Sequence, residues 1–212
     1  MSIITRMVIT YQGGSFFKVT FGDTTLAFNP ISKKSKLKQS RFGADIALMS
    51  TNNVDCNGIE NITHGDKEPF VISGPGEYEA KKVTILGFGT TTSYGGNESI
   101  NTIYLVTLEG MKVCFLGLLD SDKLPQEALE VVDDIDILFV PIGGEGTLNP
   151  SKAHELSVKL GAKVVIPMAY DDKALKKFLK EEGNEAIKPI DKLTIKRRDL
   201  EGKSGEIMIL KS

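Results

Sequence analysis

The first half of the chain is made of short runs in which β-branched and aromatic residues alternate with polar ones. A period of two is typical of strands that bury one face. Glycine pairs, a Gly-Asp pair and prolines separate the runs, as expected of turns. The pattern predicts strands at 7–13, 15–22, 24–30, 44–50, 69–73, 81–89 and 101–110, and a hairpin at Gly110 that leads into one more strand.

The second half changes to an alternation of strands and helices. Apolar spacing predicts helices at 120–134, 149–161 and 171–183. The first should begin at Asp120 or Ser121, and the second has Asn149 as its N-cap and Gly161 as its stop. Strands are expected at 135–144, 162–170, 192–198 and 205–211.

Strand-rich meanders followed by strand–helix alternation predict an α/β (α+β) fold. We expect a four-layer αββα sandwich, in which two mixed sheets pack face to face with helices outside. At 212 residues and with no linker, the chain should be a single domain over 1–212. Its strand-rich half would cover about 1–110, and its strand–helix half about 111–212.

Composition narrows the function classes. A formal net charge of −2 argues against nucleic-acid and membrane partners. No apolar run is long enough for a membrane helix, and the first residues lack the regions of a signal peptide. The two cysteines, Cys56 and Cys114, give no disulfide framework. We therefore expect a cytoplasmic protein with reduced thiols.

One order of motifs, "ITYQGGSFFKV…TLAFNP…ADIALMS…GPGEYE…VTILGFG…DIDILFVPIGG…AKVVIPMAY", resembles the metallo-β-lactamase superfamily. The resemblance runs from about residue 8 to residue 170, and "GPGEYE" and "VPIGG" are distinctive in combination. Within the superfamily, the chain is most similar to the branch of small hydrolases that includes the ascorbate-6-phosphate lactonase-like proteins. The resemblance implies the αββα sandwich and a zinc-dependent hydrolase.

The ligand positions of that family are mostly changed. In the family, paired histidines spaced i, i+2, an aspartate and further histidines hold the metal, and zinc prefers such nitrogen donors. The corresponding positions here are Thr51, Asn53, Asp55, Cys56, Thr91, Leu118 and Ala169. Only Asp55 keeps its family identity. We therefore expect no metal and no cofactor, and a pocket at the former metal positions.

Several side chains have two interpretations. Asp55 and Cys56 could ligate a lone metal or form an acid–thiol pair, but we favour a turn capped by Asp55 and a half-buried Cys56. The polar run at 90–93, with Thr51 and Asn53, could bind a sugar or a phosphate, or could line a water-filled remnant.

Three other motifs carry less chemistry. Glu77 and Glu79 in "GPGEYE" are expected to flank a structural turn. The segment "GGEG" at 143–146 has too little context for a phosphate-binding loop. The segment 32–41 carries five basic residues and is expected to be a solvated surface connection.

The main hypothesis is a divergent member that has lost its zinc site and serves in binding or assembly. Its partner would be a small polar ligand or another protein, and related proteins often form homo-oligomers. The alternative is a metal-dependent hydrolase of a small phosphorylated or lactone-like substrate with a rebuilt site. A third possibility is hydrolysis without a metal, with Asp55 as general base.

Overall fold

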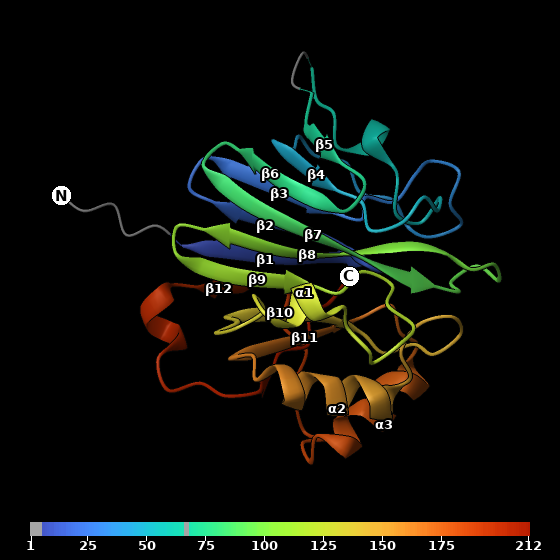
Figure 1. Cartoon of the computed structure of the whole chain (residues 1–212), viewed down its shortest axis with the longest axis vertical. Coiled ribbons are helices and arrows are strands. Elements are labelled where there is room, and N and C mark those ends of the chain that lie inside the picture. The colour runs from blue at the N-terminus through green and yellow to red at the C-terminus, as the bar shows by residue number, and fades with distance from the viewer. Residues whose placement is uncertain (1–5, 66–67) are drawn as a thin grey trace.

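Two β-sheets pack face to face to form the body of the protein (Figure 1). The computed structural model describes residues 6–65 and 68–212. Each sheet mixes parallel and antiparallel strands, as the sequence predicts.

The first sheet has six strands among the described residues. In spatial order these are β12 (Leu193–Ile195), β1 (Met7–Gly13), β2 (Phe16–Phe21), β3 (Thr24–Phe28), β4 (Ile46–Leu48) and β5 (Phe70–Ile72). Strand β2 pairs antiparallel with both β1 and β3. Strands β3, β4 and β5 run parallel to one another.

The second sheet has seven strands in the described part of the chain. In spatial order these are β13 (Glu206–Ile207), β11 (Val164–Met168), β10 (Ile137–Pro141), β9 (Met111–Phe115), β8 (Ser99–Leu108), β7 (Val83–Thr92) and β6 (Gly76–Ala80). Every residue of β10 and β11 is buried, because the sheet is covered on both faces here. Glu77 and Glu79 lie in the edge strand β6, directly after bends at Gly74 and Pro75, so they flank a turn as expected.

Helices α2 (Pro150–Leu160) and α3 (Asp172–Glu181) lie beside β10 and β11 (Figure 1). Asn149 caps α2 by accepting from the backbone of Lys152, and Gly161 ends the helix in the left-handed conformation, as predicted. The short helices are η1 (Ile59–Asn61) and η2 (Arg197–Leu200).

The helix expected at 120–134 is much shorter than the apolar spacing predicts. Only α1 (Gln126–Leu129) forms, with Pro125 before it. Proline disfavours a helical conformation in the residue before it, so the helix begins only after Pro125. Asp120 does not cap a helix, because its carboxylate accepts hydrogen bonds from Thr91 and Ser93.

The main core lies between the two sheets and is rich in phenylalanine. Ring centroids of Phe17 and Phe139 are 4.5 Å apart, and those of Phe28 and Phe115 are 5.0 Å apart. A second core fills the space between the seven-stranded sheet and the helices. Burial on this scale supplies the main stabilising free energy of the sandwich.

The expected arrangement of two mixed sheets with outer helices is confirmed. In the described residues, the α-helices cover only the seven-stranded sheet. The outer face of the other sheet is closed by loops, which bury Ile31, Ala44 and Ile62 against Ala27 and Ala47. No described helix is long and apolar enough to span a membrane.

Candidate functional site

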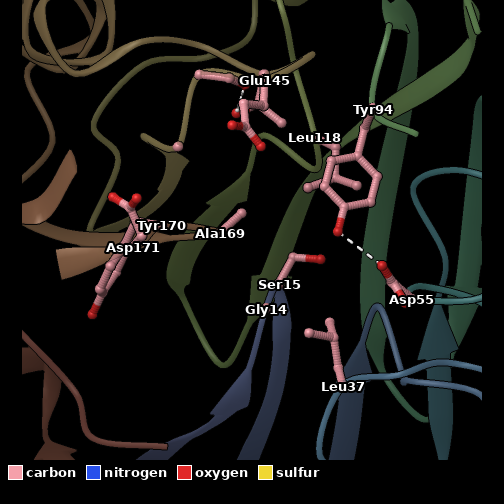
Figure 2. Close-up of a pocket in the computed structure, with 13 residues that line it drawn as sticks. Gly14, Ser15, Leu37, Asp55, Tyr94, Leu118, Glu145, Ala169, Tyr170 and Asp171 are labelled. Carbon is pink, nitrogen blue, oxygen red and sulfur yellow. Dashed lines mark hydrogen bonds between the residues drawn. The ribbon is translucent and has the colours of Figure 1, made fainter. Parts of the chain in front are cut away.

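A pocket opens where the loops that follow several parallel strands meet. It has a volume of about 270 Å³ and lies beyond the ends of β4, β9, β10 and β11 (Figure 2). Its lining residues are Gly14, Ser15, Leu37, Asp55, Tyr94, Leu118, Gly143, Gly144, Glu145, Thr147, Ala169, Tyr170 and Asp171. Loops from both sheets therefore contribute to one site.

Asp55 and Tyr94 form the one direct side-chain pair in this lining among the described residues. The Tyr94 hydroxyl donates to Asp55 Oδ2 over 2.8 Å (Figure 2). Ser35 donates its hydroxyl to the other carboxylate oxygen. Burial, followed by the hydrogen bond to Asp55, raises the pKa of Tyr94 above its usual value. The tyrosine therefore stays a proton donor and the carboxylate an acceptor.

The loop between β7 and β8 positions Tyr94. Ser93 donates its hydroxyl to Asp120 Oδ2 over 2.9 Å and its backbone N–H to Gly146 over 3.2 Å. Thr92 Oγ1 donates to the same Gly146 carbonyl and accepts from the Tyr94 N–H. Segments 92–94, 120 and 146 thus hold the tyrosine in place.

A turn after β4 positions Asp55. Asn53 caps this turn, because its side-chain oxygen accepts from the Asp55 N–H over 2.9 Å. The Cys56 N–H donates to the Asn53 carbonyl over 2.8 Å. The expectation that Asp55 caps this turn is wrong, because its carboxylate is free to accept from Ser35 and Tyr94.

Two fully buried asparagines brace the loops beneath the pocket. Asn29 donates to the hydroxyls of Ser15 and Ser50 over 3.0 and 2.9 Å. Asn101 Oδ1 accepts from the Leu118 N–H over 2.8 Å. Asn101 also donates to the Leu116 carbonyl, so it fixes the turn after β9. Such satisfied buried networks make the loop positions rigid.

The seven positions that correspond to the family's metal ligands do not all lie in one pocket. Asp55, Leu118 and Ala169 line the pocket, and Ala169 has a left-handed φ of 52°. The others, Thr51, Asn53, Cys56 and Thr91, are not lining residues. Thr51 contacts Ser99 Oγ at 3.3 Å, and Thr91 donates to Asp120 over 3.2 Å. Of the polar run at 90–93 and its neighbours, only Tyr94 reaches the pocket wall.

The side chains at these positions do not fit a zinc ion. Cys56 is fully buried with Ser15 Oγ at 3.7 Å from its sulfur, and burial raises its pKa to about 12. Leu118 and Ala169 offer no donor atom. Across residues 6–65 and 68–212, no group of three or more His, Cys, Asp or Glu side chains could hold a metal ion. His154 is paired with Glu182 at 2.9 Å.

Sequence reasoning missed four lining residues that carry ionisable groups, namely Tyr94, Glu145, Tyr170 and Asp171. Each follows or lies within a segment already singled out in the sequence: the polar run at 90–93, "VPIGG" and "AKVVIPMAY". A search for polar and aromatic side chains next to those motifs would have found them. Their meeting depends on loops that are far apart in sequence.

Comparisons with known proteins place these observations in a family. The sequence profile of the Beta-lactamase superfamily domain matches residues 8–169. A UPF0173 metal-dependent hydrolase of Listeria innocua is 26% identical over 241 aligned positions, covering 95% of this chain and 96% of the relative. A second, from Bacillus licheniformis, is 26% identical over 198 positions, covering 77% and 85%.

A solved structure agrees with these sequence relatives. A protein of Thermotoga maritima, assigned to the Zn-dependent hydrolases of the metallo-β-lactamase superfamily, superposes with a TM-score of 0.75. The two are 26% identical, and the match covers 96% of this chain and 98% of that one.

These relatives correct the main functional hypothesis. The main hypothesis of a divergent member that serves only in binding or assembly is contradicted, because proteins similar along nearly the whole chain are named metal-dependent hydrolases. The alternative, a metal-dependent hydrolase with a rebuilt site, agrees better with the names of these relatives. The superfamily profile covers most of the sequence and the fold matches over almost all of it. The chain therefore belongs to the metallo-β-lactamase superfamily.

Proposed function

We propose that this protein is a hydrolase of a small ester-like or lactone-like substrate and that Asp55 and Tyr94 are its catalytic pair. The observation that carries the proposal is the 2.8 Å hydrogen bond between the two side chains at the pocket wall. The hydrolase names of the relatives support the reaction class. The metal dependence in those names belongs to those proteins.

In this reaction, the Asp55 carboxylate takes a proton from a water molecule while the water oxygen attacks the carbonyl carbon. The carbon–oxygen bond to the leaving group then breaks, and the leaving oxygen takes the proton of the Tyr94 hydroxyl. Tyr94 regains a proton from Asp55 across their hydrogen bond. One water is consumed, and an acid and an alcohol, or one hydroxy acid, are released.

The pair has properties that suit these roles. Tyr94 is kept protonated, because its pKa is raised by burial and by Asp55. Asp55 is half-buried at the wall, so a water molecule can reach it. General acid–base groups contribute about 10²–10⁴-fold to such reactions. No step passes through a metal, since the donors described above do not fit one.

The test is hydrolysis of a panel of lactones and aryl esters by the wild type and Asp55→Asn, each with and without added Zn²⁺ or Mn²⁺. We expect turnover to fall by about 10²-fold or more in Asp55→Asn under every metal condition. Asparagine keeps an oxygen acceptor for Tyr94, so the fold should persist. Asp23→Asn, in an exposed turn between β2 and β3, is the matched control. Equal turnover by wild type and Asp55→Asn would contradict the assignment.

A further inference from the structure

We propose that Ser15 is a further catalytic residue, whose hydroxyl donates a hydrogen bond to the oxygen that becomes negatively charged when water attacks the substrate carbonyl. The inference rests on the proposed function, because it adds a residue to the same reaction in the same pocket. In that reaction Asp55 and Tyr94 transfer protons, and the charge on the carbonyl oxygen still needs a partner.

The charge that develops on the carbonyl oxygen must be stabilised from the pocket wall. No lysine, arginine or histidine lines the pocket in the described part of the chain. No group of three or more His, Cys, Asp or Glu side chains among the residues described could hold a metal ion. A preorganised neutral hydrogen-bond donor can do this work where water is excluded. The donor is therefore sought among hydroxyl and N–H groups.

One hydroxyl of the lining faces the catalytic pair without being used by it. The side-chain hydroxyls among the described lining residues are those of Ser15, Tyr94, Thr147 and Tyr170. The Tyr94 hydroxyl donates to Asp55. Thr147 Oγ1 donates to the Gly144 carbonyl over 2.9 Å. Tyr170 lies on the side of the pocket away from the pair, whereas the Ser15 hydroxyl points toward the pair (Figure 2).

Asn29 fixes the direction in which the Ser15 proton can point. Asn29 Oδ1 accepts from the Ser50 backbone N–H over 2.7 Å, so this atom is the amide oxygen. The amide nitrogen Nδ2 therefore faces Ser15 and donates to its hydroxyl oxygen over 3.0 Å. Since an amide nitrogen does not accept a hydrogen bond, the Ser15 proton points away from Asn29.

The other neighbour of this hydroxyl is the Cys56 thiol. Its sulfur lies 3.7 Å from Ser15 Oγ and is fully buried. Burial raises the pKa of the thiol to about 12, so the thiol keeps its proton and can donate to the hydroxyl oxygen. A hydroxyl accepts two hydrogen bonds and donates one, so Asn29 and Cys56 can fill both acceptor positions. The proton of Ser15 is then left for an acceptor in the pocket.

The turn between β1 and β2 holds Ser15 in place before the reaction begins. The Gly14 carbonyl in this turn accepts from the Ala169 N–H and from the Tyr11 hydroxyl, each over 2.7 Å. Ser15 itself is only 3% exposed. A donor that is fixed and desolvated in advance needs no reorganisation when the charge develops.

Ser15 keeps its proton throughout the reaction. The hydrogen bond to the carbonyl oxygen strengthens as the attacking water converts this atom to an oxyanion. When the carbon–oxygen bond to the leaving group breaks, the electron pair of the oxyanion re-forms the carbonyl and the hydrogen bond weakens. The proton transfers of Asp55 and Tyr94 are unchanged.

Kinetics of Ser15→Ala on a hydrolysed ester test the assignment. We expect kcat to fall by about 10²-fold and KM to change by less than about threefold, because this hydrogen bond is strong only in the transition state. Ser50→Ala is the matched control, since the Ser50 hydroxyl accepts from the same Asn29 over 2.9 Å, is 1% exposed and does not line the pocket.

Both substitutions leave one Asn29 N–H without its acceptor, so they should lower the free energy of unfolding to a similar extent. The kcat of Ser15→Ala should be at least about tenfold below that of Ser50→Ala. Equal losses of kcat in the two variants would trace the effect to Asn29 and overturn the inference.

A pair of ketones with the acyl group of the ester gives a readout that a loosened turn alone does not move. A trifluoromethyl ketone is hydrated in water and resembles the tetrahedral intermediate, whereas the matched methyl ketone stays planar. The wild type should bind the trifluoromethyl ketone at least about tenfold more tightly, and Ser15→Ala should lose most of that preference. An unchanged preference in Ser15→Ala would overturn the donor role. An acyl group found covalently attached to Ser15 would also overturn it.

Asp55→Asn separates this inference from the proposed function. Loss of hydrolysis in both Asp55→Asn and Ser15→Ala supports both. Hydrolysis that depends on Asp55 and not on Ser15 overturns the donor role and keeps the catalytic pair. A wild type that hydrolyses no ester, yet prefers the trifluoromethyl ketone through Ser15, overturns the catalytic proposal and keeps the donor role.

Discussion

Asp55 and Cys56 are neighbours in the chain, but the Asp55 side chain faces the pocket and the Cys56 side chain is buried. Asp55 reaches the pocket and accepts hydrogen bonds from two hydroxyls. Cys56 turns inward, is fully buried and contacts Ser15. Since the thiolate is the reactive form of cysteine, a pKa raised to about 12 by burial leaves this thiol inert. The chemistry at this turn therefore belongs to the carboxylate.

The buried thiols predict a loss of stability at alkaline pH. Burial raises the pKa of Cys56 and Cys114 from 9.0 to about 12. The unfolded chain releases these protons near pH 9, whereas the folded chain retains them until about pH 12. The stabilisation is thus complete below pH 9 and decreases above it. The free energy of unfolding should fall by up to about 1.4 kcal/mol per pH unit for each thiol.

Urea unfolding between pH 8 and 10 measures this slope, because buried tyrosines add to it mainly at higher pH. Cys114→Ala should remove about half of the decrease in that interval. A free energy of unfolding that stays constant up to pH 10 would show that the thiols ionise equally in both states.

At the scale of elements, a regular hydrophobic pattern predicts the bounds of a strand or helix well, and a pattern interrupted by proline does not. The β1 range is the predicted 7–13, and α2 begins and ends at its predicted caps. These elements follow from local alternation and capping chemistry. The helix expected at 120–134 fails at its start, because α1 begins only after Pro125 and Asp120 binds the 91–93 segment instead.

The site was only partly predictable for a related reason. Asp55 could be found because it follows a recognisable strand and motif. Tyr94 lies next to the polar run at 90–93, but its pairing with Asp55 could not be found, because the position of Tyr94 depends on Asp120 and Gly146, which approach from distant parts of the chain. Local sequence carries no signal for such tertiary contacts.

The loop that contains Gly146 lies close to the loop that contains Ser93 and Tyr94, and this contact gives a testable prediction. A Cβ on Gly146 would lie 2.4 Å from the Ser93 carbonyl group and 2.5 Å from the Tyr94 nitrogen. Gly146→Ala should therefore lower the free energy of unfolding by about 2–4 kcal/mol. It should also lower kcat, since Tyr94 must move away from Asp55. Chemical denaturation and steady-state kinetics measure the two effects.

Gly144→Ala is the control in the same loop. Gly144 also has a positive φ, of 78°, but among residues 6–65 and 68–212, its chain neighbours aside, no atom lies within 4 Å of an added Cβ. Gly144→Ala should lower the free energy of unfolding only by the backbone strain, about 1–2 kcal/mol, and should leave kcat near the wild-type value. Equal effects of the two substitutions on kcat would contradict the role given to Gly146.

At the scale of the whole molecule, the pocket is a product of packing one sheet on the other. Asp55 follows β4 of the six-stranded sheet, and Tyr94 follows β7 of the seven-stranded sheet. Their hydrogen bond therefore joins the two halves of the sandwich. The superfamily scaffold brings the loops to one end, and the residues on them decide the chemistry.

A double-mutant cycle tests most directly whether the two residues act as one catalytic pair. The measurement is kcat/KM of the wild type, Asp55→Asn, Tyr94→Phe and the double variant on one hydrolysed ester. We expect each single substitution to lower kcat/KM by about 10²-fold, and the double variant to be no worse than the more damaging single. Wild-type kcat/KM in Tyr94→Phe, or losses that multiply in the double variant, would contradict a shared role.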